Sequence, residues 1–190
     1  LQGDINENVQ LSGKLATQYK VAEKYGGDFG KSMERVGSAV NEVAASGANQ
    51  AGFLVDYLKR LSGISAQTNI SADAQLGYAA ALDEAGQSVE VSGTTMSKII
   101  VDMYKDADQY AKISGVSTAE CSTLLKTDAN EALLVFLEGL NGNNEGFEQM
   151  TKKKEGLKLE GARSVAVLSS LAANTDNVRA TQKIANKASV

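Results

Sequence analysis

The chain contains no proline in 190 residues. Proline interrupts α-helices more strongly than any other residue, because it lacks an amide hydrogen and clashes with the preceding turn. Alanine, the best helix former, is abundant. Apolar residues recur with helical spacing, most clearly from Met96 to Tyr110, and no segment shows the sustained alternation of a strand. The sequence therefore predicts an all-α fold, a compact bundle of about eight to nine short helices.

Local signals place the ends of the expected helices. Ser117 and Asp128 each stand three residues before a glutamate, which is the spacing of a capping box at a helix start. Glycine, which readily closes a helix, follows periodic segments at positions 47, 86, 115 and 142. These signals predict helices over 31–46, 50–61, 72–85, 88–113, 118–126, 129–140, 145–155, 161–173 and 176–188, and a weaker helical pattern in residues 1–25. We further expect a helical lead-in over residues 1–48 and a core helical domain over 49–190.

Two of these segments carry distinctive packing residues. In the segment 129–140, Leu133, Phe136 and Leu137 share one helical face, so we expect them to anchor the core. Alanines at positions 79, 80, 81 and 85 leave little side chain between neighbouring backbones. Such a run of small residues predicts a close crossing of this helix with a neighbour.

Several chemical classes are excluded by residues that the chain lacks. Without histidine there is no imidazole base, no Ser-His-Asp or Cys-His nucleophile, and no zinc site of the usual type. The single cysteine, Cys121, allows no disulfide within the chain, and we expect it to be a buried structural residue. Paired carboxylates of a glycosidase need an aromatic cleft, yet the chain has no tryptophan. We therefore expect no enzyme activity and no catalytic, cofactor-binding or metal-binding residues.

The charge balance is mildly acidic, with a net charge of −4 and a sequence pI of about 5.0. Nucleic-acid binding without sequence preference relies on clustered Lys and Arg, so we do not expect it here. The longest apolar run, 132–137, is too short to cross a membrane. The sequence begins at Leu1 and shows no signal peptide, so we expect a piece of a longer protein.

Two short motifs resemble ligand-binding loops but lack an essential part. Residues 26–32 (GGDFGKS) resemble a phosphate-binding loop, but the glycine spacing is one residue short and no strand precedes it. We expect a turn in which Asp28 caps the next helix. Residues 141–146 (NGNNEG) resemble a calcium loop, but Lys152 stands where the bidentate glutamate belongs. We expect a loop without a bound ion.

Basic residues gather in two places, at lysines 152–154 and at Arg179, Lys183 and Lys187 of the last expected helix. Cations near a helix C-terminus also complement the helix dipole, so the second group has an ordinary structural explanation. The chain offers no complete chemical site, so we expect partners to bind through its surface. The loop 141–146 and the basic helix 176–188 are the segments that we expect to make such contacts, because both are polar.

An ordered series of segments over residues 49–188 resembles the shared core region of phage tail tape measure proteins, the proteins that determine tail length. The stretches that carry the resemblance are 79–86 (AAALDEAG), 89–96 (VEVSGTTM), 110–117 (YAKISGVS), 128–140 (DANEALLVFLEGL) and 168–176 (LSSLAANTD). Cys121 departs from the pattern, because a larger apolar residue is common at its position. Residues 1–48 match only weakly.

The resemblance implies a structural protein of the virion tail, encoded by a phage or a prophage and made in the cytoplasm of the bacterial host. Such a protein sets tail length, takes part in tail assembly and genome delivery, and has no cofactor. Its implied partners are the tail tube protein, tail assembly chaperones and baseplate proteins, besides self-association. Two other classes stay open: a tail-associated peptidoglycan hydrolase segment, and a non-viral helical scaffold or interaction module.

Overall fold

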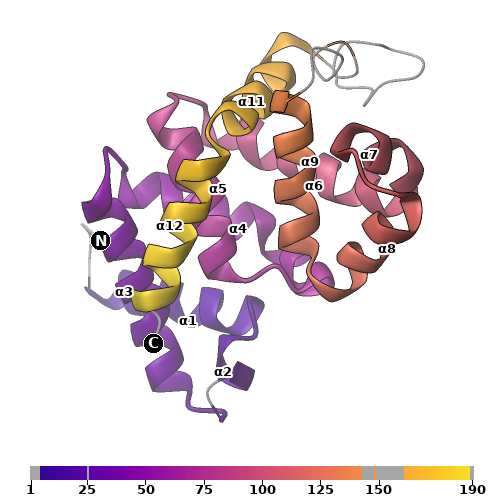
Figure 1. The fold of residues 1–190 in the computed structure, drawn as a ribbon. Coiled ribbons are helices and arrows are strands. Elements are labelled where there is room, and N and C mark those ends of the chain that lie inside the picture. The colour runs from indigo at the N-terminus through magenta and orange to yellow at the C-terminus, as the bar shows by residue number, and fades with distance from the viewer. Residues whose placement is uncertain (1–4, 25, 143–147, 149–160, 189–190) are drawn as a thin grey trace.

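A computed structural model describes residues 5–24, 26–142, 148 and 161–188 of the chain. Every regular element in these residues is a helix, and the helices pack into one bundle (Figure 1). The helices are α1 (Ile5–Gln18), α2 (Val21–Lys24), α3 (Phe29–Ser46), α4 (Ala51–Thr68), α5 (Ala72–Glu84), α6 (Val89–Lys105), α7 (Ala107–Ser114), α8 (Thr118–Thr127), α9 (Ala129–Gly142), α11 (Gly161–Ala173) and α12 (Thr175–Ala188). The predicted all-α bundle is confirmed.

Helix α5 lies at the centre of the bundle. All of its residues from Ala72 to Leu82 are buried except Asp73, and it packs against α3, α4, α11 and α12. Ala79, Ala80 and Ala81 are among these buried residues, as the predicted alanine-lined packing requires. Small residues are required here because helices surround α5 on several sides. Ala85 is exposed just after the end of α5, so the prediction is wrong for this fourth alanine.

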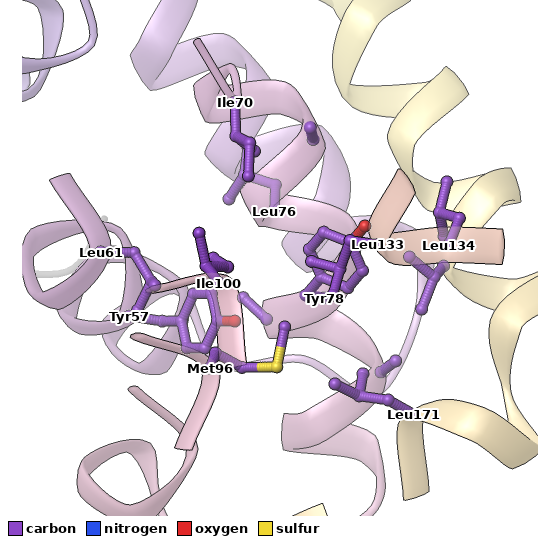
Figure 2. Close-up of a cluster of buried hydrophobic side chains, with 14 of the residues drawn as sticks. Tyr57, Leu61, Ile70, Leu76, Tyr78, Met96, Ile100, Leu133, Leu134 and Leu171 are labelled. Atoms are coloured by element: carbon purple, nitrogen blue, oxygen red, sulfur yellow. The ribbon is translucent and has the colours of Figure 1, made fainter. Parts of the chain in front are cut away.

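Larger side chains fill the space between α5 and its neighbours (Figure 2). Tyr57 and Leu61 of α4 and Met96 and Ile100 of α6 lie together in this cluster, and each is at most 2% exposed. Leu133 of α9 joins the same cluster from another side. The cluster thus ties four helices together through apolar contacts, which the helical periodicity of each segment predicts.

The N-terminal caps behave as their local spacing predicts. Ser117 accepts a hydrogen bond from the Glu120 amide at 3.2 Å, and the Glu120 carboxylate accepts one from the Ser117 amide at 2.8 Å. This arrangement is the complete capping box. Ser71 accepts from the Ala74 amide at 3.1 Å and starts α5. Gly115 ends α7 with a φ of 70°, a left-handed conformation that glycine adopts without strain.

Several predicted boundaries are wrong. The segment 88–113 is two helices, because Asp106 ends α6 and its side chain caps α7 by accepting from the Gln109 amide at 3.2 Å. Helix α4 continues to Thr68 instead of residue 61, and it ends at Asn69, whose φ is 57°. The boundary predicted at Gly47 is confirmed, although Gly47 closes α3 in an extended conformation instead of a left-handed one. Gly142 is the last residue of α9, so the predicted end at residue 140 is two residues early.

The number of helices is also larger than predicted, since the described residues contain eleven. Eight of the nine predicted segments lie in the described residues. The split at Asp106 adds one helix, and α1 and α2, within the weaker helical pattern of residues 1–25, add two. The predicted helix 145–155 lies outside the described residues apart from Glu148. The division of the chain at residue 48 stays a prediction. No helix in the described part of the chain combines the length and apolar character needed to cross a bilayer.

Candidate functional site

The phosphate-loop-like segment 26–32 is a turn followed by a helix start. Gly26 and Gly27 have φ values of 65° and 85°, and Asp28 accepts a hydrogen bond from the Lys31 amide at 3.0 Å. These contacts hold the pKa of the Asp28 carboxyl below its ordinary value. The predicted cap is therefore confirmed. The element before the turn is the short helix α2, whereas a phosphate-binding loop follows a strand.

Cys121 lies in α8 with 3% of its surface exposed. Burial raises the pKa of its thiol above the ordinary value. A raised pKa keeps the thiol protonated at neutral pH, and the protonated thiol is not nucleophilic. The prediction of a buried structural cysteine is confirmed. The calcium-loop-like segment lies mostly outside the described residues, which include only Asn141 and Gly142 of it, at the end of α9.

The described residues do form a polar cleft of about 350 Å³ where α5, α9 and α12 meet. Asn130 and Glu131 come from α9, and Arg179 and Gln182 come from α12. The remaining lining residues are Ser71, Asp73, Ala74, Leu134, Lys183 and Asn186. Leu134 is the only large apolar side chain among them, so the cleft is lined mainly by charged and hydrogen-bonding groups.

Amide side chains form the hydrogen-bond network beside this cleft. The Tyr78 hydroxyl donates to Asn130 Oδ1 at 2.8 Å, and Asn130 Nδ2 donates to Gln182 Oε1 at 3.1 Å. Gln182 Nε2 donates in turn to the Ala74 carbonyl at 3.0 Å. Burial raises the pKa of Tyr78, so its hydroxyl stays a neutral donor. The network joins α5, α9 and α12, and its members satisfy one another.

Arg179 makes a second connection between α12 and α9. Its Nη1 and Nη2 atoms each donate to an oxygen of the Glu131 carboxylate at 2.8 Å, and its Nε atom donates to Glu138 Oε1 at 2.9 Å. Paired bonds of this kind fix the geometry of both side chains. These contacts correct two predictions. The Glu131 carboxylate binds Arg179 and so completes no capping box, although Asp128 does cap α9 by accepting from the Glu131 amide at 2.9 Å.

The second correction concerns the basic helix, which we expected to offer Arg179, Lys183 and Lys187 to partners. The guanidinium of Arg179 is occupied within the chain, so only the two lysines are exposed cations of α12. Reversing the charge at Arg179 would place a negative side chain next to the carboxylates of Glu131 and Glu138. Such a variant would lose stability, and it could not report on a partner surface alone.

Acid is expected to remove the contribution of the Glu131–Arg179 pair. The hydrogen bonds from Arg179 lower the pKa of Glu131 below its ordinary 4.5. A lowered pKa in the folded state means that the contribution is complete above pH 4.5 and disappears as the pH falls through the folded value. Glu131→Gln should therefore cost about 1 kcal/mol of unfolding free energy at pH 7 and less at pH 3, measured by urea titration.

The matched control is Glu90→Gln, which removes an exposed partner of Arg60 at 3.4 Å. We expect less than about 0.5 kcal/mol from this control at either pH, because exposed pairs contribute little. An equal cost of Glu131→Gln at pH 7 and pH 3 would show that the pair is not held by charge.

No local pattern in the sequence points to the residues of the cleft. Arg179 lies 48 positions from Glu131, and Gln182 lies 52 from Asn130. No local spacing signals such pairs. The available signal is indirect: a polar stripe at positions 179, 182, 183 and 186 runs along one side of α12. Within the described residues, no group of three or more His, Cys, Asp or Glu side chains is placed to hold a metal ion. The polar contacts of the cleft hold α5, α9 and α12 to one another.

Comparison with known proteins gives one match. The family model described as phage-related minor tail protein matches residues 1–162, which is 162 of the 190 residues. The matched part includes helices α1 to α9. No curated protein and no solved structure matches the chain.

Proposed function

Because the chain belongs to the family of phage-related minor tail proteins, we propose that it is a segment of a tape measure protein, which sets the length of the tail during assembly. The match over residues 1–162 is the observation that carries the proposal. Membership of this family makes the chain a component of the phage tail that contacts other tail proteins. It also favours a tail protein over the non-viral scaffold that the sequence left open.

The helical character of the chain supports a role in measuring length. A helix advances by about 1.5 Å per residue, so a chain laid out as helices along a tube converts residue number into distance. Every regular element among the described residues is a helix, and single residues such as Asp106 and Asn174 separate successive helices. The bundle is the form of the free chain in this proposal. The same helices line up along the tube in the assembled tail.

Contacts with other proteins, and no chemistry, are the proposed contribution of this segment. The tail tube protein, the tail assembly chaperones and the baseplate proteins are the proposed partners, together with further copies of the chain. Synthesis in the host cytoplasm and participation in genome delivery belong to the same proposal. The one thiol is buried and the polar groups of the cleft bind one another. These observations do not favour the peptidoglycan hydrolase alternative.

Tail length is the measurement that tests the proposal. An in-frame deletion of these 190 residues from the phage gene should shorten the tails by about 285 Å in electron micrographs. If the segment stayed folded as a bundle in the tail, its loss would shorten the tail by only about 40 Å, the diameter of a globule of this size. Tails of unchanged length would overturn the proposal.

A point variant tests whether the number of residues or the folded bundle determines the length of the tail. Phe136→Ala keeps the number of residues but removes a core side chain. Tails that form with this variant should have wild-type length, because a ruler of this kind counts residues. Shortened tails from Phe136→Ala would instead mean that the folded bundle determines the length.

A further inference from the structure

Helix α12 buries fewer large apolar side chains than α9, a helix of the same length. Within α12, Val178 is the one branched aliphatic side chain that is fully buried. The other buried residues of this helix are Thr175, Thr181 and Ala185. Helix α9 also has 14 residues, but it buries four leucines and Phe136. Apolar burial therefore holds α12 much less firmly than α9.

Besides this burial and its close packing against α5 and α3, α12 is attached by polar contacts. Asn177 Nδ2 donates to Glu84 Oε2 of α5 at 2.8 Å, and Gln182 Nε2 donates to the Ala74 carbonyl of α5 at 3.0 Å. Arg179 binds Glu131 and Glu138 of α9. These side chains are partly exposed, since 32% of the Arg179 side chain and 37% of the Glu131 side chain face solvent. Water can replace such contacts, so their net contribution to stability is small.

The connection to α11 is a single residue. Asn174 separates Ala173, the last residue of α11, from Thr175, the first of α12, and both Ala173 and Asn174 are exposed. Helix α11 is anchored independently by Val167, Leu168 and Leu171, each of which is fully buried. A change of backbone angles at Asn174 can therefore move α12 and leave α11 in place.

Helix α12 packs closely against the small residues of α5 around Gly77. A methyl group at Gly77 would lie 2.7 Å from the Val178 carbonyl oxygen and would also contact Gln182. The two helices thus approach closely at Gly77. Figure 1 shows α12 running along the bundle beside α5 and α3. Its opposite side carries Asp176, Ala180 and Lys187, all exposed.

We propose that α12 is a releasable helix, which detaches from α3, α5 and α9 as a unit while the rest of the bundle stays folded. Release breaks the Arg179, Gln182 and Asn177 contacts and uncovers the surface of α5 around Gly77. The detached helix has 14 residues, and a free helix of that length is only marginally stable in water. Its amide hydrogens therefore exchange with solvent whenever it is released. This inference does not depend on the tape measure proposal.

Native-state hydrogen exchange of the wild-type chain tests the release directly. The amides of Ala180–Ala188 should exchange at least about tenfold faster than those of Leu133–Leu140, with little dependence on low concentrations of urea, as expected for opening of a small unit. The α12 exchange should also quicken with added salt, because salt screens the partly exposed Arg179 pairs. If α12 and α9 exchange at the same rate with the same urea dependence, the two helices open only together and the proposal is wrong.

Three variants sharpen the test. Arg179→Gln should speed the exchange of α12 amides by about tenfold and leave that of α9 nearly unchanged. Lys183→Gln removes the same charge one turn later from an exposed side chain, so it should change neither. Gly77→Ala should speed α12 exchange at any salt concentration, because its effect is steric. If Arg179→Gln and Lys183→Gln gave equal effects, or if α9 changed as much as α12, the Arg179 contacts would not hold α12 in place.

Discussion

Truncation of Phe136 to alanine is expected to lower the free energy of unfolding by about 3–5 kcal/mol, the usual cost of emptying a core aromatic site. Phe136 is fully buried in α9, and its ring centre lies 4.7 Å from that of Tyr110 in α7 at a tilt of 50°. The variant loses both the buried area and this ring contact. For a chain of this length the melting temperature should fall by roughly 6–20 °C in a circular dichroism melt.

Phe29→Ala is the matched control, because it removes the same group from a side chain that is 48% exposed at the start of α3. We expect this control to cost less than about 1 kcal/mol. An unchanged melting temperature for Phe136→Ala would mean that the site collapses around the smaller side chain. Phe136 would then be buried in the core, as the sequence predicts, without adding to the stability of the chain.

Gly139→Ala is expected to destabilise the chain by roughly 2 kcal/mol, even though alanine is the better helix former. A methyl group at this position of α9 would meet the carbonyl oxygen of Ile113 and would lie 2.8 Å from the Cα atom of Ser114. Both atoms belong to the backbone at the end of α7, so they cannot rotate away as a side chain would. The variant must push α7 and α9 apart, and chemical denaturation should show the loss.

The control for this substitution is Gly63→Ala in α4, where a methyl group would meet no atom within 4 Å. There the usual gain of about 0.5–1 kcal/mol from replacing a helical glycine should appear. The two substitutions are chemically identical, so opposite signs isolate the close approach of α7 and α9. A stabilising Gly139→Ala would show that these helices separate at little cost.

The sequence predicts those features of the fold that depend on near neighbours. The Ser117 capping box follows from a spacing of three residues, and the burial of Leu133, Phe136 and Leu137 follows from their shared helical face. The apolar periodicity does not predict the break at Asp106, because the apolar stripe from Met103 to Tyr110 continues across it. A local signal does exist, since Asp106 and Gln109 have the spacing of an N-terminal cap.

The candidate site depends on contacts that no local pattern records. Glu131 has the spacing of a capping-box residue, yet its carboxylate binds Arg179 because α12 packs beside α9 in the folded chain. The same packing brings Gln182 to Asn130 and leaves no room for a side chain at Gly77. Periodicity predicts that each of these helices exists, but it does not give their order in space. The cleft and its polar network could therefore be found only from the assembled bundle.

The most direct test of the proposed function is the length of tails from a phage whose gene carries these 190 residues twice. A defect in assembly gives short, absent or irregular tails, whereas a ruler gives longer tails of one defined length. Duplication should lengthen the tails by about 285 Å, the distance that 190 helical residues span. Tails of wild-type length from the duplicated gene, with the longer protein present in the virions, would contradict the proposal that this chain measures the tail.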